Sequence, residues 1–196
     1  MLDVEFLKTI YRINNDLSLL DLQTLLGKSK TSFFNPHEYI IEEGCAKREL
    51  FFIVSGLVRS FKLKDTGEEI TTSIIWENQF MGSHDTALFY QPSQFYFEAL
   101  EPTQVLHIDF ELLENILNLN PKLQHGRKAV ANEIMRQIFR RLNSFILLSP
   151  EERYCEFIKE NPLIVNRVPN KYIANLLGIT PVSLSRIRKR ISLKKQ

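Results

Sequence analysis

The chain has 196 residues, of which 44% are hydrophobic and 24% charged, values typical of a globular protein rather than a disordered one. Its longest apolar run, residues 50–58, is interrupted by Ser55 and Gly56 and is too short to span a bilayer, so we expect no membrane partner. Cys45 and Cys155 lack metal-ligand spacing and form no disulfide framework, and the N-terminus is acidic where a signal peptide is basic. These features favour a reducing, cytoplasmic setting.

Charge is distributed unevenly along the chain. The net charge is only +2, yet residues 161–196 contain eight Lys and Arg and no Asp or Glu. The residues before them hold 17 basic groups against 23 acidic ones. An acidic body with a strongly basic end predicts a module that binds a polyanion, and a merely solvated basic tail is the alternative.

The first part of the chain predicts two helices followed by short strands. Residues 2–13 and 18–27 have apolar residues at helical spacing. Beyond residue 31, turn residues such as Asn35-Pro36 and Ser55-Gly56 separate short apolar or alternating segments, which are 33–34, 39–41, 50–54, 58–63, 70–76, 95–100 and 105–108. Turns about every ten residues predict an antiparallel β-roll or jelly-roll barrel with flanking helices, a domain of residues 1–120.

Helical spacing returns after the barrel. A short helix is predicted over residues 109–118 and, after Asn120-Pro121, a long amphipathic helix within a segment of residues 121–148. Phe139 and Ile146 widen its apolar side beyond what one domain contact needs, so we expect it to pack against a second copy of itself. Packing only against its own barrel is the alternative. The predicted dimer interface consists of Val130, Ile134, Ile138, Leu142 and Phe145.

Residues 149–196 predict a helix-turn-helix domain. Ser149-Pro150-Glu151-Glu152 is a capping box that starts one helix. Further along, apolar residues at helical spacing end at Gly178, where a helix often ends in a left-handed residue. Thr180 and Pro181 then cap and begin a second helix with a basic outer face. In a helix-turn-helix, this second helix enters the major groove of DNA.

Ten residues of this domain are predicted to contact double-stranded DNA. Arg186 is the candidate for reading a base, because an Arg can bind O6 and N7 of guanine with two hydrogen bonds. A phosphate contact or a solvated side chain is the alternative for Arg186. Val182 suits a thymine methyl group and Ser183 suits a base or a phosphate, whereas the remaining basic residues and Tyr172 suit phosphates. The set is Lys171, Tyr172, Thr180, Pro181, Val182, Ser183, Ser185, Arg186, Lys189 and Arg190.

A β-barrel, a long helix and a helix-turn-helix in this order resemble the Crp/Fnr family of bacterial transcription regulators over essentially the whole chain. Four turn glycines look matched, and so do the C-terminal signatures at 153–154, 173–180 and 184–189; the glycines are Gly44, Gly56, Gly67 and Gly82. The resemblance implies an α+β fold with a cyclic nucleotide-binding-like β-roll, a dimerisation helix and a winged helix-turn-helix. It also implies a homodimer that reads inverted-repeat sites, with RNA polymerase as a further partner.

The sequence departs from the family where members bind cyclic AMP. Those members carry Gly-Glu-Leu and, further along, Arg-Ser-Ala or Arg-Thr-Ala, whose Arg grips the phosphate. Here Ser83-His84 follows Gly82, Ser93-Gln94-Phe95 stands downstream, and residues 65–121 contain no Lys or Arg. Because burying a phosphate without a cation is costly, we do not expect control by cyclic AMP. The candidate effector pocket consists of Arg59, Gly82, Ser83, His84 and Phe95.

We expect no metal, no cofactor and no enzymatic activity. The histidines are dispersed, two cysteines are too few for an iron–sulphur cluster, and no Ser/His/Asp set, Gly-rich phosphate loop or paired acid stands out. The sequence therefore predicts a dimeric transcription regulator whose effector is an unknown small molecule or absent. The alternative is a sensor whose barrel binds a non-nucleotide ligand and which acts through a protein partner.

Overall fold

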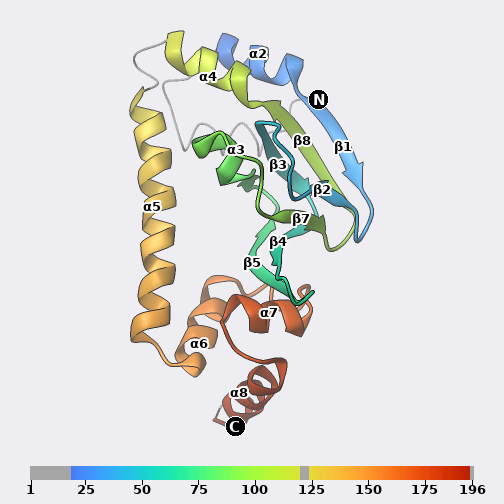
Figure 1. The fold of residues 1–196 in the computed structure, drawn as a ribbon. Coiled ribbons are helices and arrows are strands. Elements are labelled where there is room, and N and C mark those ends of the chain that lie inside the picture. Colours follow the sequence, from blue (N-terminus) through green and yellow to red (C-terminus); the bar gives the residue numbers. More distant parts are fainter. Residues whose placement is uncertain (1–18, 120–123, 195–196) are drawn as a thin grey trace. The chain divides into compact units, whose positions relative to one another are not determined.

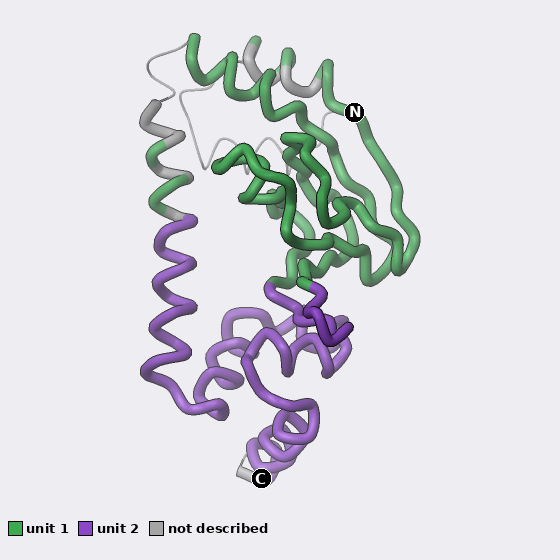
Figure 2. The backbone as a smooth tube through the Cα atoms, in the orientation of Figure 1, with its two compact units in different colours: residues 1–62, 73–133 green, residues 63–72, 134–196 purple. Residues whose placement is uncertain are grey.

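A computed structural model describes residues 19–119 and 124–194 (Figure 1). The chain divides into two compact units, residues 1–62 with 73–133 and residues 63–72 with 134–196 (Figure 2). The helix predicted over residues 2–13 and the break predicted at Asn120-Pro121 lie outside the described residues. No helix of the described residues is long and apolar enough to cross a membrane.

Two antiparallel four-stranded sheets form the predicted β-roll, with strand orders β1-β8-β3-β6 and β2-β7-β4-β5. The strands are β1 (Lys30–Phe34), β2 (Tyr39–Ile41), β3 (Glu49–Ser55), β4 (Leu57–Leu63), β5 (Glu69–Trp76), β6 (Phe80–Met81), β7 (Tyr96–Ala99) and β8 (Thr103–Asp109). The seven segments predicted from the sequence correspond to seven of these strands. The two-residue β6 was not predicted, because a strand this short leaves no period to recognise.

The apolar run of β3 is buried on both faces. Phe51 and Ile53 belong to the cluster between the sheets, together with Val58. Phe52, between them in sequence, instead packs with Ile108 and with Ile116 of the following helix. Adjacent strand residues point to opposite faces of a sheet, so a continuous apolar run indicates a strand that is covered on both sides.

A tight turn at Gly56 joins β3 to β4. Gly56 has φ 106°, in the region that favours glycine. A Cβ at this position would lie 2.6 Å from the Cα of Thr103, which no side chain tolerates. Gly56 therefore lets the β3–β4 turn lie directly against the start of β8.

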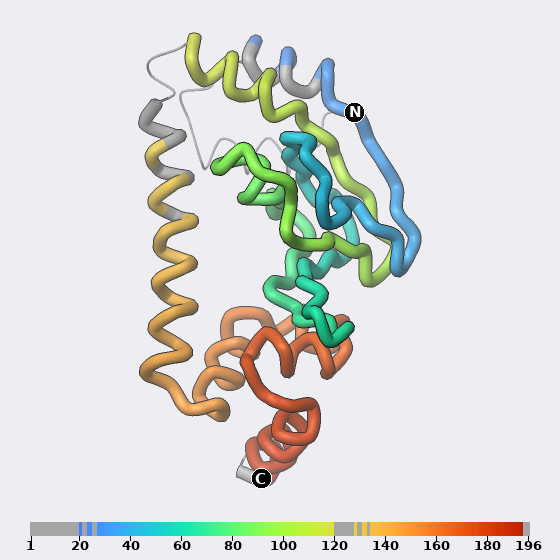
Figure 3. Tube along the Cα trace, in the orientation of Figure 1, coloured from blue at the N-terminus to red at the C-terminus, as the bar shows by residue number. Residues whose placement is uncertain are grey.

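Four helices accompany the strands, namely α2 (Leu19–Lys28), α3 (His84–Phe89), α4 (Phe110–Leu119) and α5 (Gln124–Leu147). α2 and α4 lie side by side although they are far apart in the sequence (Figure 3). Asp109 Oδ1 caps α4 by accepting the backbone N–H groups of Glu111 and Leu112 at 2.9 and 3.1 Å. α2 and α4 were predicted within two residues of their ends, and α5 lies inside the segment of residues 121–148 in which a long helix was predicted, whereas the six-residue α3 was not predicted.

The C-terminal part contains α6 (Pro150–Glu160), α7 (Asn170–Leu176) and α8 (Pro181–Lys194). The predicted capping box is present: the Ser149 hydroxyl accepts the Glu152 N–H at 3.4 Å, and the Glu152 carboxylate accepts the Ser149 N–H at 2.8 Å. These bonds hold the pKa of Glu152 below its usual value, and the bond with the Ser149 side chain contributes more than the bond with the Ser149 backbone. The described residues contain no strand after β8, so the wing implied by the resemblance is not part of the described helix-turn-helix.

Candidate nucleic-acid interface and sensor cassette

The outer side of α8 is exposed and basic. Val182 is 61% exposed, and Ser185, Arg186 and Lys189 are exposed as well. The opposite side is buried, with Leu184 at 0% and Ile187 at 3% exposure. One helix therefore presents a polar face to solvent while its apolar face holds it on the domain.

The start of α8 is fixed by its turn. Thr180 Oγ1 accepts the Ser183 N–H at 3.1 Å and also lies 2.9 Å from the Ser183 hydroxyl, which confirms the predicted cap. Gly178 has φ 66°, as expected for a left-handed residue after a helix. A Cβ on Gly178 would lie 2.7 Å from Cε1 of Phe145, so the turn depends on glycine for both its backbone and its packing.

The prediction that Tyr172 contacts DNA is wrong. Tyr172 is only 4% exposed, and its ring packs inside the helix-turn-helix beside Ile173 and Ala174, which are fully buried. Lys171, the residue before it, is exposed, with its ammonium 4.6 Å from the centre of the Tyr172 ring. Of these two residues, only Lys171 has its side chain at the surface, since adjacent helix residues point in different directions.

Two other basic residues of α8 have surroundings that the sequence did not indicate. Arg190 Nε lies 2.7 Å from a carboxylate oxygen of Glu151 in α6, although the Arg190 side chain is 57% exposed. Arg188 faces inward, with its guanidinium carbon 5.6 Å from the centre of the Tyr154 ring. Nε and Nη2 of Arg188 are buried and have no hydrogen-bond partner in the described part of the chain.

The predicted dimer face of α5 is open to solvent in the single chain. Ile138 is 57% exposed, Leu142 50% and Phe145 40%, whereas Ile134 is half-buried. The Val130 side chain lies outside the described residues. Phe145 also packs within its own chain, because the Arg153 guanidinium lies 4.9 Å from the centre of its ring.

Arg59 does not belong to an effector pocket, contrary to the prediction. Val58 lies in the cluster between the sheets, so Arg59, the next residue in β4, points to the opposite face. There its Nε and Nη2 lie 2.6 and 2.5 Å from Oε2 of Glu98, its register partner in β7. Oε1 of Glu98 also contacts Nδ1 of His37 at 2.7 Å. Arg59 is therefore engaged in a buried ion pair and does not face a ligand inside the roll.

The other four residues of the predicted pocket serve mainly the fold. Gly82 lies against β3, where a Cβ would be 2.8 Å from the carbonyl oxygen of Glu49. Ser83 is 3% exposed, His84 is exposed at the start of α3, and Phe95 packs against the cluster between the sheets. With Arg59 on the far face of its sheet, the five residues do not surround one cavity.

A buried carboxylate joins the two halves of this cassette, defined here as residues 82–85 and 93–95. Asp85 is 9% exposed, and its Oδ2 accepts the Gln94 backbone N–H at 2.9 Å. Lys62, which the sequence argument missed because it lies outside residues 65–121, donates to the Gln94 side chain at 3.1 Å. The Gln94 N–H and the Lys62 ammonium are groups that favour an anion, and both are already bonded to other groups of the protein.

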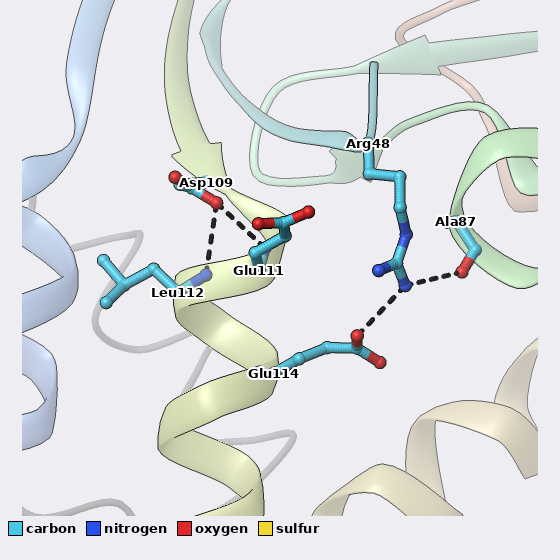
Figure 4. Close-up of polar contacts among 6 residues, drawn as sticks. All are labelled: Arg48, Ala87, Asp109, Glu111, Leu112 and Glu114. Carbon is cyan, nitrogen blue, oxygen red and sulfur yellow. Dashed lines mark hydrogen bonds and ion pairs between the residues drawn. The ribbon is translucent and has the colours of Figure 1, made fainter. Parts of the chain in front are cut away.

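Arg48 connects the cassette helix α3 to α4 (Figure 4). Its Nη2 donates to the Ala87 carbonyl oxygen at 3.2 Å and to Glu114 Oε2 at 3.0 Å. Its guanidinium also stacks over the rings of Tyr90 and Phe110, at 4.3 and 4.7 Å. No group of three or more His, Cys, Asp or Glu side chains in residues 19–119 and 124–194 is arranged to hold a metal.

The family model for the cyclic nucleotide-binding domain matches residues 31–120, the part of the chain that forms the β-roll and α4. The electron transport regulator A of Shewanella oneidensis is 29% identical over 168 residues, which cover 76% of this chain and 64% of the relative. The anaerobic regulatory protein of Pasteurella multocida is 26% identical over 195 residues, which cover 90% of this chain and 67% of the relative. The chain thus spans about two thirds of the length of these relatives.

Solved structures share the same fold. FixK2 of Bradyrhizobium japonicum superposes with a TM-score of 0.71 at 19% identity, covering 85% of this chain and 86% of that one. A CooA mutant of Carboxydothermus hydrogenoformans gives 0.68 at 17% identity, covering 91% and 86%. The matched domain, the similar regulators and the shared fold agree with the element order and the C-terminal signatures, and they support the resemblance of this chain to transcription regulators of the Crp/Fnr family.

Proposed function

We propose that this protein is a sequence-specific DNA-binding regulator that acts as a homodimer on inverted-repeat sites and is not controlled by cyclic AMP. The observation that carries the proposal is the exposed basic face of α8, whose start is capped by Thr180 and whose Arg186 side chain is exposed. A helix so presented fits the major groove, where its N-terminal residues reach base edges.

Homodimerisation is supported by the apolar side of α5. Met135, Ile138 and Phe139 are each more than half exposed, and the side continues through Leu142 to Ile146. A monomer rarely leaves such a continuous apolar stripe in water. A second copy of the same helix covers it symmetrically and places two copies of α8 about a two-fold axis, which an inverted repeat matches.

Independence from cyclic AMP is supported by the electrostatics of the cassette. The buried carboxylate of Asp85 accepts the Gln94 N–H, and a phosphate at that place would face a like charge. Ser83 and Ser93 stand where nucleotide-binding members have Glu and Arg. We expect cyclic AMP at millimolar concentration, far above the dissociation constant of a working effector, to leave DNA affinity unchanged. Titration calorimetry on the free protein checks the binding step, and measurable heat of binding would contradict this part of the proposal.

The decisive experiment selects fragments of genomic DNA with the ligand-free protein at about physiological salt, where non-specific phosphate binding is weak. An enriched inverted repeat supports the proposal. Arg186→Ala should then lose about 1–3 kcal/mol on that site and relax base preference at one position per half-site. Lys189→Ala is the matched control, since loss of a phosphate contact weakens all sequences alike. Unchanged selection by Arg186→Ala would favour a sensor that acts through a protein partner.

A further inference from the structure

A cavity of about 500 Å³ that is open to solvent lies on the surface of the C-terminal helices, between α6, the turns of residues 161–168 and α8. Its wall is mainly apolar and consists of Tyr154, Ile158, Pro162, Val165 and Ile191. The residues assigned to DNA contact do not line the cavity.

The polar side chains of the wall favour an anion. They are the ammonium of Lys159 and the amide of Asn166, and no carboxylate is among the described residues that line the cavity. The chain from residue 161 to the C-terminus has eight basic residues and no acidic one. An anion in the cavity therefore meets hydrogen-bond donors and no repelling charge from the wall.

Arg188 adds a half-buried guanidinium beside the cavity. It precedes the wall residue Ile191 by three positions on α8, which places both on one face of the helix. Its guanidinium carbon lies 5.6 Å from the ring centre of Tyr154, another wall residue. Because Nε and Nη2 of Arg188 are buried and lack an acceptor in the described chain, their charge is not neutralised locally. Its guanidinium therefore adds to the positive charge near the cavity.

We propose that this cavity binds a small organic anion with an apolar body, namely a short aliphatic or aromatic carboxylate. The apolar body displaces water from Ile158, Val165 and Ile191, while the carboxylate lies near Lys159 and in the field of Arg188. Binding stabilises the folded helix-turn-helix because the ligand contacts both α6 and α8. The inference is independent of the proposed DNA target, since the residues that line this cavity are not those assigned to DNA contact.

Cys155 provides a direct test, because it lines the cavity and is exposed. The full chain is treated with iodoacetamide, and alkylation of Cys155 and Cys45 is followed by mass spectrometry. Hexanoate and benzoate at about 10 mM should slow alkylation of Cys155 several-fold and leave the alkylation rate of Cys45 unchanged. Acetate, which lacks the apolar body, and hexylamine, which lacks the anion, should protect little. Equal protection by hexylamine, or none by either carboxylate, overturns the proposal.

Variants separate the charges from the cavity. Lys159→Met and Arg188→Met keep chain length and should each weaken protection by hexanoate several-fold. Arg140→Met is the matched control, because Arg140 is an exposed Arg of α5 that does not line the cavity. Lys159 is exposed, so its variant remains folded even if Arg188→Met unfolds, which circular dichroism reports. If Lys159→Met and a folded Arg188→Met both retain full protection, the cavity does not recognise the anion.

Discussion

Glu98 holds together the outer face of the second sheet. It faces Arg59 across the β4–β7 ladder and Tyr39 across the β2–β7 ladder. The side chains of Arg59 and Glu98 are 3% and 6% exposed, and the Arg59 guanidinium also lies 4.1 Å from the centre of the Phe61 ring. Removing one partner of a buried ion pair strongly destabilises the fold, because the remaining charge stays buried without its partner.

Glu98→Leu should therefore destabilise the roll by about 3 kcal/mol, since it leaves Arg59 buried without its carboxylate. Arg59→Met alone should destabilise the roll by a similar amount, because it leaves the Glu98 carboxylate buried without its cation. Arg59→Met combined with Glu98→Leu is the control, and it should be closer to the wild type than either single change, because both charges are gone. Urea unfolding of the four proteins gives the cycle, and additive costs would show that the two side chains do not act as a pair.

At the scale of elements, the hydrophobic period and the turn residues predicted seven strands, the helices α2, α4 and α5, and the helix-turn-helix. They did not predict which way some of the side chains point. Tyr172 lies in the seven-residue α7, too short for its buried side to be read from spacing alone, and Arg188 is one of several basic residues whose inward position depends on how α8 packs. Arg59 is different: the period of two in β4, with Val58 pointing inward, already places Arg59 on the outside.

The capping box of α6 shows how a short motif determines an element boundary. Ser149→Ala should cost about 1 kcal/mol, because the first turn loses the acceptor for the Glu152 N–H. The bonds to Ser149 lower the pKa of Glu152, so its ionised form stabilises the fold fully above its usual value of 4.5. This contribution is lost as pH falls through the lowered pKa. Glu152→Gln should flatten the acid limb of a thermal-stability profile, and an unchanged limb would contradict the assignment.

At the scale of the whole molecule, the apolar side of α5 bears on whether this helix joins two chains. In the described chain, Ile138 and Leu142 are four residues apart on one side of α5 and at least half exposed. Under the proposed homodimer, a second copy of the same helix covers this side along its length.

Leu142→Asp tests whether α5 joins two chains, because in a dimer it places a carboxylate opposite the same carboxylate of the second copy. Burying unpaired like charges costs several kcal/mol, enough to shift a micromolar dimer to monomer. Arg140→Asp places a carboxylate at an exposed position on the opposite side of the helix and should remain dimeric. Light scattering reports both masses. The Leu142→Asp monomer should also bind a single half-site as well as the wild type does but lose its preference for the inverted repeat, since nothing then links the two copies of α8. A wild type of monomeric mass would instead mean that the exposed side of α5 serves another contact.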